Sequence, residues 1–275
     1  MSSALVELHS FVSYRFPDHL AVRQVGTNTD VTAPPPTHVA CIMDGNRRWA
    51  ARQSVPENAG HRAGQTAALE VIDAARSVGV RWLTLYAFSS ENWHRPGEEV
   101  TFLMNLVQRT IRLHALALHA KGIRCRFLGA DDPRIPAALR RDIADLENLT
   151  RDNRTMTLTA AFGHGGRGDL VHAAQSLIRA GIPAESVTEK LFAAHLPLPD
   201  TPDVDLVIRT SGEQRISNFM LWQVAYAEWI FPSELWPDFG TEPFLKCLDA
   251  FSRRQRRFGA RPQTAAHVPT GANLA

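Results

Sequence analysis

Short apolar runs alternate with longer mixed stretches along most of the chain, and this alternation predicts the order of its strands and helices. The apolar runs predict strands at 38–43, 82–88, 125–129, 155–162 and 204–208. The stretches between them predict helices at 62–78, 98–122, 136–152 and 168–181, and an apolar helix that starts near 217 and includes Glu228. Strands that alternate with helices are typical of a parallel sheet. We therefore expect an α/β fold, with a mainly parallel central β-sheet flanked by helices on both faces.

The two ends of the chain do not follow this alternation. Residues 1–37 contain a weak helix candidate followed by TNTDVTAPPPT, whose prolines and threonines predict a loop or linker. Residues 260–275 are small and polar and predict a disordered tail. We expect an N-terminal extension at 1–37, a single domain at 38–259 and a tail at 260–275. A chain of 275 residues with 44% hydrophobic content can bury one sizeable core.

Composition narrows the class of protein. The chain has 30 basic and 28 acidic residues, so its net charge of +2 provides no bulk attraction for nucleic acid. It has no run of 18 apolar residues, and its first residues lack the pattern of a secretory leader. Cys41, Cys125 and Cys247 lie far apart, which is typical of buried thiols in a reducing cytosol. We expect a cytoplasmic protein with at most peripheral membrane contact and no nucleic-acid partner.

The segment HVACIMDGNRRW at 38–49 carries the strongest chemical signal. A buried strand ends in Asp44, Gly45 and Asn46 and passes directly into two arginines. Backbone N–H groups at a helix start attract anions, arginines grip phosphate oxygens in pairs, and a carboxylate can share Mg²⁺ with those oxygens. This arrangement predicts a site for a metal-bound polyphosphate. The alternative is a common strand-to-helix turn in which Asp44 only caps the helix.

Two further strands end in similar polar clusters. FSSENWHRP at 88–96 follows one predicted strand, and RTSGEQRIS at 209–217 follows another. In an open α/β sheet, ligands bind beyond the carboxyl ends of the strands. The three clusters are therefore expected to meet at one site.

A glycine motif offers a different reading. GHGGRG at 163–168 fits G-x-G-x-x-G between a predicted strand and helix, and Glu185 and Glu189 stand at about the spacing of a ribose-binding acid. The motif is weak because these acids fall near a predicted helix start and not at the tip of a second strand. An NAD(P)-dependent oxidoreductase remains an alternative on this basis.

Several motifs together resemble the cis-prenyltransferase family, the isoprenyl transferases typified by undecaprenyl diphosphate synthase. They are HVACIMDGNRRWA, GHRAG, LTLYAFSSENWHRP, GGR, DLVIRTSGEQRISNF and LWQVAYAEWIF followed by LWPDF, in order from about His38 to Gly259. The resemblance implies an apolar tunnel for the prenyl chain and condensation of isopentenyl diphosphate with a C5–C15 allylic diphosphate. The product would be a Z-configured prenyl or polyprenyl diphosphate, and Mg²⁺ would be the cofactor.

The resemblance also assigns residues, by matching positions of this sequence. It implies catalytic roles for Asp44 and Asn92 and metal binding by Asp44 and Glu228. The residues it implies for substrate binding are Gly45, Asn46, Arg47, Arg48 and His61 at the allylic diphosphate, Arg209, Arg215 and Ser217 at isopentenyl diphosphate, and Trp49, Ser89, Ser90, Trp93 and Arg95 in the substrate-site segment. No residue stands out as the general base, and released diphosphate could itself take the proton.

Departures from the family pattern keep two alternatives open. Glu57 stands where many members have an arginine facing the allylic diphosphate, and Gly163 and His164 replace the usual Asn-Tyr. These changes suggest a specialised bacterial paralogue, and they leave open an irregular, head-to-middle condensation of two allylic units. Some members are non-catalytic partner subunits that have lost active-site residues, whereas this chain keeps Asp44, Asn92 and Arg209.

Tunnel length and assembly are further expectations. Ala87 is small where bulky side chains obstruct the tunnel of short-chain members, and Phe102, Leu103, Met104 and Leu106 are candidates for the tunnel floor. The family is dimeric, and residues 221–236 carry more large apolar surface than one core requires. We expect a homodimer with its interface in the C-terminal third.

Overall fold

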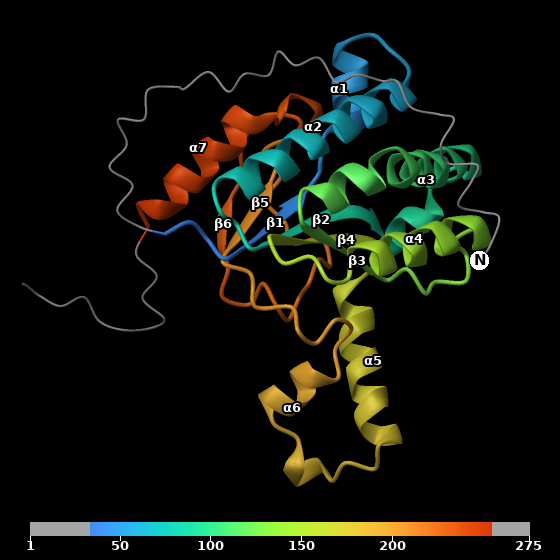
Figure 1. Ribbon diagram of the computed structural model, residues 1–275, viewed down its shortest axis with the longest axis vertical. Coiled ribbons are helices and arrows are strands. Elements are labelled where there is room, and N and C mark those ends of the chain that lie inside the picture. Colours follow the sequence, from blue (N-terminus) through green and yellow to red (C-terminus); the bar gives the residue numbers. More distant parts are fainter. Residues whose placement is uncertain (1–33, 255–275) are drawn as a thin grey trace, which may run out of the picture. The chain divides into compact units, whose positions relative to one another are not determined.

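The computed structural model describes residues 34–254 (Figure 1). The predicted extension lies outside the described residues except for 34–37, and the predicted tail at 260–275 lies wholly outside them. The helices and strands, in chain order, are β1 (His38–Ile42), α1 (Asn46–Arg52), α2 (Glu57–Ser77), β2 (Trp82–Ser89), η3 (Ser90–His94), α3 (Gly97–Ala120), β3 (Ile123–Leu128), α4 (Ala137–Thr150), β4 (Met156–His164), α5 (Gly166–Arg179), η4 (Ala184–Ser186), α6 (Glu189–Ala194), β5 (Leu206–Arg209), β6 (Glu228–Ile230), η5 (Trp236–Asp238) and α7 (Thr241–Ser252).

The strands form one six-stranded sheet in the order β3-β4-β2-β1-β5-β6, and every neighbouring pair is parallel. The expected parallel α/β sheet is therefore confirmed. From β1 the chain first moves to β2 on one side and later returns to β5 on the other side. The sheet thus has its topological switch point between β1 and β5, where Ile42 pairs with Arg209. Ligands of such sheets bind in the crevice at that point.

One face of the sheet is covered by α2, α3, α4 and α7, whose apolar stripes meet the inward-facing strand residues in one large core. Val71 of α2, Leu103 of α3, Ile143 of α4 and Phe244 of α7 are all buried there. Each of these helices is amphipathic, so burial of its apolar stripe against the sheet supplies most of its stability.

The opposite face differs from the expectation. Residues 217–227 form turns and bends and not the predicted helix, and Glu228 begins strand β6. Phe219, Met220 and Val224 of this segment are buried against the sheet in a second, smaller core. The apolar pattern correctly marked a buried segment, but positive φ angles at Ser217, Asn218 and Met220 exclude a regular helix there.

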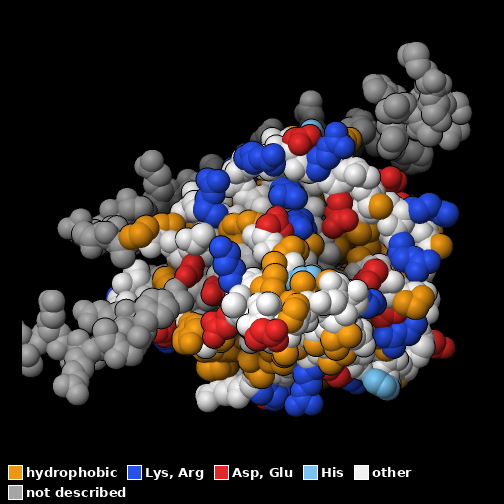
Figure 2. Space-filling model, turned by 90° about the horizontal axis from the view of Figure 1, so that it is seen from below, with side chains coloured by type: hydrophobic (Ala, Val, Ile, Leu, Met, Phe, Trp, Pro, Cys, Tyr) orange, Lys and Arg blue, Asp and Glu red, His pale blue; other side chains and the backbone are white. Residues whose placement is uncertain are grey.

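Helices α5 and α6 extend away from the sheet and pack against each other (Figure 1). On α5, Val171 is 56% exposed and Ile178 is 76% exposed. In the view from below, a band of hydrophobic side chains crosses the face of the molecule, with charged side chains above it (Figure 2). This side of the fold therefore presents apolar surface to its surroundings.

Candidate active site

Asp44 lies immediately beyond the carboxyl end of β1, in a turn that fixes its backbone from both sides. Its N–H donates to Thr210 Oγ1 at 3.0 Å, and its carbonyl accepts from Thr210 Oγ1 at 2.6 Å and from the Trp236 N–H at 3.0 Å. Gly45 follows with φ 111°, and a Cβ there would lie 3.0 Å from Leu235 Cδ2. A glycine is needed at this position because the backbone is left-handed and closely packed.

Three guanidinium groups surround the Asp44 carboxylate. Arg48 Nη2 lies 3.2 Å from Oδ1, whereas Arg209 Nη2 and Arg215 Nη2 lie 2.9 and 3.8 Å from Oδ2. Glu213 pairs with both Arg48, at 3.1 Å, and Arg215. Three positive charges therefore face two negative ones, and the excess charge is positive. A cluster of this kind can bind a diphosphate through charge-assisted hydrogen bonds.

Arg209 is the fixed member of this cluster. Its side chain is only 4% exposed, and Nη1 donates to the Arg215 carbonyl at 2.6 Å and to Ser217 Oγ at 2.7 Å. Its Nε atom is buried and has no hydrogen-bond partner among the described residues. Arg48 and Arg215 are about half exposed and are held by ion pairs to Asp44 and Glu213. The site thus combines one buried guanidinium with two that are open to solvent.

A second polar cluster lies across the mouth of the site. His61 Nε2 of α2 is 3.5 Å from Glu99 Oε1, and Arg95 Nη1 donates to the same oxygen at 2.9 Å. Burial lowers the pKa of the His61 ring below its usual value, against the opposing charge of Glu99, so the ring is neutral near pH 7. Nearby, Arg47 pairs with Glu57 at 2.8 Å, and this pair neutralises the charge of Arg47. Glu57 occupies the position at which the motif pattern usually has a further arginine.

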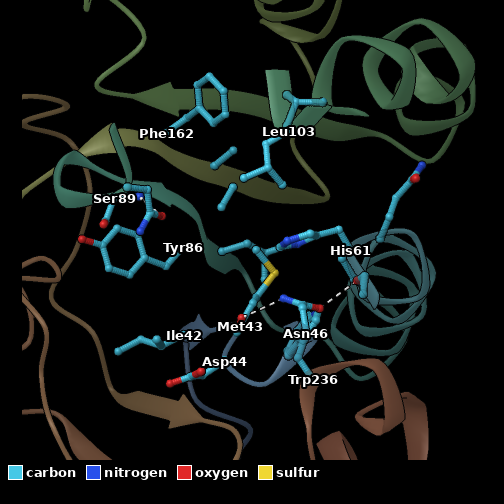
Figure 3. A pocket seen from close by; sticks show the side chains of 18 of the residues that line it. Ile42, Met43, Asp44, Asn46, His61, Tyr86, Ser89, Leu103, Phe162 and Trp236 are labelled. Atoms are coloured by element: carbon cyan, nitrogen blue, oxygen red, sulfur yellow. Dashed lines mark hydrogen bonds between the residues drawn. The ribbon is translucent and has the colours of Figure 1, made fainter. Parts of the chain in front are cut away.

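These groups open into a cavity of about 1180 Å³ (Figure 3). Asp44 and Met43 lie at one side of it, and Leu103 and Phe162 lie on the other. The deeper wall is apolar and includes Leu106, Ile111, Leu118, Leu146 and Leu158. Along α3, Leu103 and Leu118 are separated by roughly 22 Å at the helical rise of 1.5 Å per residue. The cavity therefore joins an anion site to a long apolar space.

Most of the predicted site residues line this cavity, and some do not. Those that line it are Asp44, Gly45, Asn46, Arg47, Arg48, His61, Ser89, Asn92, Arg95, Arg209, Arg215 and Ser217. Trp49 instead donates its Nε1–H to Asp238 at 2.7 Å, and Trp93 packs edge-on against Phe88 under the Arg134 guanidinium. Ser90 lies against Gly165, where an added Cβ would meet its Oγ at 2.4 Å.

Two lining residues make local contacts. The Asn92 side chain accepts from the Ser89 N–H at 3.0 Å and so holds the turn after β2. Asn46 Nδ2 donates to the Met43 carbonyl at 3.2 Å, and its Oδ1 packs where a Cβ on Gly64 would stand. Both amides therefore line the cavity and hold the backbone turns around it in place.

Glu228 requires a correction. It pairs in register with Leu206, at the amino end of β5, and its carboxylate accepts from Arg254 at 2.8 Å. Asp44 lies beyond the carboxyl end of the sheet, so the two acids do not share a metal ion within one chain. The expectation placed Glu228 in a helix, but this segment is a short edge strand.

The expected tunnel floor is also revised. Leu103, Leu106 and Ala87 line the cavity, whereas Phe102 and Met104 do not. The far end is formed by Leu118, Leu146 and Leu158, which come from three separate elements. Nothing in the local sequence pattern brings these three together.

The glycine motif at 163–168 has its helix N-terminus already occupied. The Gly166 N–H donates to the Asn218 carbonyl at 2.7 Å, and the Arg167 N–H donates to Asn218 Oδ1 at 2.8 Å. A pyrophosphate would need these N–H groups. The dinucleotide interpretation is therefore disfavoured by the geometry.

Sequence reasoning missed three residues of the site. Thr210 holds the Asp44 backbone, Glu213 tethers two arginines, and Asn218 closes the start of α5. Glu213 and Thr210 lie within the recognised RTSGEQRIS segment, so a residue-by-residue analysis of that motif would have found them. Asn218 acts through both its backbone carbonyl and its side-chain Oδ1, and its partners lie about 50 residues away in the chain, so no local pattern reports the contact.

Comparisons with known proteins agree with this geometry. The family model described as "Putative undecaprenyl diphosphate synthase" matches residues 42–259. Isoprenyl transferase 2 of Corynebacterium efficiens is 43% identical over 82% of this chain and 93% of that protein. A Thermobifida fusca trans,polycis-polyprenyl diphosphate synthase, (2Z,6E)-farnesyl diphosphate specific, is 42% identical over 86% of this chain and 85% of that protein. The crystal structure of lavandulyl diphosphate synthase from Lavandula x intermedia, in complex with dimethylallyl diphosphate, has a TM-score of 0.79 and 36% identity, and it covers 84% of this chain and all of that chain.

Proposed function

The chain belongs to the undecaprenyl diphosphate synthase family of cis-prenyltransferases, and we propose that it condenses isopentenyl diphosphate with a C5–C15 allylic diphosphate to give a Z-configured prenyl diphosphate. The observation that supports this most strongly is the Asp44 cluster of three arginines at the switch point of the sheet, at the mouth of a 1180 Å³ cavity with an apolar interior. A diphosphate head and a growing hydrocarbon chain need these two environments side by side.

The proposed chemistry begins with loss of diphosphate from the allylic carbon. That step leaves a delocalised cation and a highly charged leaving group, so fixed positive charge around the departing oxygens lowers the barrier. We assign Arg47 and Arg48 to the allylic diphosphate, and Arg209, Arg215 and Ser217 to isopentenyl diphosphate. The neutral His61 ring and the Asn92 turn then orient the reacting groups at the cavity mouth.

The residues fit the Mg²⁺ ion that the family implies. Mg²⁺ is bound in proteins through one or two carboxylates together with substrate phosphates. Asp44 supplies one partly exposed carboxylate, and no group of three or more histidine, cysteine or acidic side chains in residues 34–254 is arranged to hold a metal by itself. Asp44 would hold the ion together with a bound diphosphate. The ion would neutralise charge on the departing oxygens.

The decisive experiment incubates the protein with Mg²⁺, isopentenyl diphosphate and labelled C5, C10 or C15 allylic diphosphate, followed by mass analysis of the products. We expect products that grow by five carbons per addition, and diphosphate release in equal amount. Asp44→Ala is the matched negative control. If no allylic primer is extended while the protein is folded and Mg²⁺ is saturating, the proposal is wrong.

An irregular condensation is the second candidate, and the Arg47–Glu57 pair favours it. The pair removes one free positive charge from the allylic side, and a structural neighbour at 36% identity is a lavandulyl diphosphate synthase. The same assay with dimethylallyl diphosphate alone distinguishes the two. A branched C10 product formed without isopentenyl diphosphate would support the irregular reaction.

The remaining proposals concern assembly and location. We propose a homodimer with its interface in the C-terminal third. We propose further that the apolar side of α5 takes part, which is supported by the exposure of Val171 and Ile178 and by the hydrophobic band of Figure 2. Light scattering that gives a monomer at micromolar concentration would contradict it. Within residues 34–254, no helix has both the length and the apolar character needed to cross a membrane. A cytoplasmic location stays a prediction.

A further inference from the structure

A strained loop, residues 217–220, begins at Ser217 in the proposed isopentenyl diphosphate site. Ser217, Asn218 and Met220 have φ angles of 48°, 60° and 42°. Non-glycine residues with positive φ are uncommon and persist only where the surroundings fix them. Three of them among four residues therefore require strong external restraint.

This loop controls the rigid arginine of the site. Ser217 Oγ accepts from Arg209 Nη1 at 2.7 Å, and Arg209 Nη2 donates to Asp44 Oδ2 at 2.9 Å. A change in the loop conformation would move Ser217 and remove a contact that orients the buried guanidinium. The strain in the loop is thus coupled to the geometry of the anion site.

The buried His164 ring provides the restraint from the sheet side. Its Nε2 accepts from the Met220 N–H at 3.1 Å, and the ring stands edge-on to Phe219 and Tyr86, with centroid distances of 6.1 and 5.8 Å. Tyr86 in turn stacks on Phe219 at 4.4 Å. His164 is 1% exposed, so no water competes for the Met220 N–H.

Asp169 faces the other side of that ring. Because Nε2 accepts from Met220, the neutral ring carries its proton on Nδ1. Nδ1 lies 3.4 Å from Asp169 Oδ2, and neither atom has a hydrogen-bond partner among the described residues. Burial lowers the pKa of His164 to about 4, so the ring stays neutral at physiological pH and keeps Nε2 as an acceptor. The same effect raises the pKa of Asp169 to about 7.

We propose that His164 and Asp169 are positioning residues for the isopentenyl diphosphate site, and that they act by clamping the 217–220 loop so that Ser217 holds Arg209. The proposal rests on the proposed function, because it names the substrate of that site. It assigns no contact between either residue and the substrate. The pair acts through Met220, Ser217 and Arg209.

The first test uses His164→Leu, which keeps bulk but removes the acceptor, and His164→Gln, which retains an acceptor of similar reach. We expect His164→Leu to raise KM for isopentenyl diphosphate on the order of 10-fold, with KM for the allylic substrate changed less than about 2-fold. His164→Gln should restore most of the loss. Amide exchange followed by mass spectrometry should show faster exchange at 217–221 in the leucine variant.

Two further variants separate positioning from stability. Asp169→Leu keeps similar bulk but removes the acceptor that faces the Nδ1–H, so the ring proton is no longer held on that side and the variant should show the same KM effect. His38→Leu is the matched control, because His38 is an equally buried ring with two hydrogen bonds at the amino end of the sheet. It should lower Tm without changing the ratio of the two KM values.

The outcomes decide the proposal in each case. It is overturned if His164→Leu and Asp169→Leu leave KM for isopentenyl diphosphate unchanged, or raise both KM values by the same factor. If His164→Leu does not fold, Asp169→Leu alone decides. If the wild-type protein does not consume isopentenyl diphosphate, the proposed function fails separately. Calorimetric binding of inorganic diphosphate then tests the clamp: weaker binding with faster exchange supports it, and unchanged binding overturns it.

Discussion

The two ends of the central sheet carry similar residue types but satisfy them differently. At the amino end, the His38 ring reaches the Pro202 carbonyl at 2.9 Å and Thr84 Oγ1 at 2.8 Å, and Asp205 accepts from the N–H groups of Thr37 and His38. At the carboxyl end, three arginines share Asp44 with Glu213, as described above. At the amino end each of these groups is paired within the protein, whereas the carboxyl end has an excess of positive charge.

Buried side-chain atoms that lack a hydrogen bond among the described residues occur in several places. Arg209 Nε, His61 Nε2 and Asn46 Oδ1 belong to residues that line the cavity at the carboxyl end, whereas Arg76 and Thr201 lie outside the cavity. Buried polar groups are normally paired, so clustered exceptions indicate a place where a ligand completes the set. The number of charged residues alone therefore does not distinguish the two ends of the sheet. The carboxyl end differs in its excess positive charge and in the unpaired buried atoms around its cavity.

The largest expected effect comes from removing one carboxylate at each end of the sheet, Asp44 at the carboxyl end and Asp205 at the amino end. Asp44→Ala should reduce turnover by about 10³-fold or more with the fold retained, because it removes charge placement at the reacting centre. Asp205→Ala at the amino end should lower the free energy of unfolding by about 1–3 kcal/mol, through loss of its backbone partners, and leave turnover per folded molecule unchanged. Steady-state kinetics and urea denaturation measure the two. Wild-type activity for Asp44→Ala at saturating Mg²⁺ would contradict the comparison.

The next effect concerns an arginine at each end. Arg215→Ala should raise KM for isopentenyl diphosphate by about 30- to 1000-fold, because a guanidinium–phosphate contact contributes about 2–4 kcal/mol in a partly desolvated site. Arg254→Ala removes the partner of Glu228 at the amino end and should leave both KM values unchanged. If Arg215→Ala alters only the allylic KM, the assignment of the two diphosphates must be exchanged.

The two ends should also differ in how their buried histidines make the free energy of unfolding depend on pH. Burial lowers the pKa of His38 from 6.5 to about 4, which corresponds to about 3 kcal/mol. The unfolded chain binds this proton below pH 6.5 and the folded chain does so only near pH 4, so stability should fall as pH drops through that window. At the carboxyl end, burial lowers the pKa of His164 to about 4 as well, which also destabilises the fold as pH drops. Burial raises the pKa of Asp169 to about 7, so its carboxyl group takes up a proton in the folded state over part of the same range and offsets the loss of stability caused by His164.

Urea denaturation at pH 7.5 and pH 4.5 measures this effect. His38→Gln should flatten the pH dependence of the free energy of unfolding, because the titrating ring is gone. Equal pH slopes for the wild-type and variant proteins would show that His38 is not the group responsible.

The smallest effect concerns Glu57, the acidic residue that pairs with Arg47 on the allylic side. Glu57→Gln should lower KM for the allylic diphosphate by about 2- to 5-fold, since it releases Arg47 from an exposed ion pair worth at most about 1 kcal/mol. Glu242→Gln, which breaks a similarly exposed pair with Lys246 on α7, is the control and should change neither KM. A rise in the allylic KM of Glu57→Gln would mean that Glu57 itself orders the site.

Most of the fold followed from the sequence because its signals are local. The apolar runs at 38–43 and 82–88 are strands, and the stretches at 98–122 and 136–152 are helices, within a few residues of the predicted bounds. The segment at 217–227 failed because its apolar residues face the sheet from a turn. Side-chain hydrophobicity marks burial there, but backbone dihedrals decide the conformation.

The sequence by itself determined the family motifs, the strand-to-helix alternation, and the residue types gathered at the strand ends. Only the tertiary structure decided which of them meet. Asp44 and Arg209 are 165 residues apart in the chain and touch because β1 and β5 are neighbours, whereas Glu228 starts its strand at the opposite end of the sheet. The cavity floor and the His164 clamp depend in the same way on packing between distant elements. Such contacts are set by long-range register and shape complementarity, which no local pattern of residues encodes.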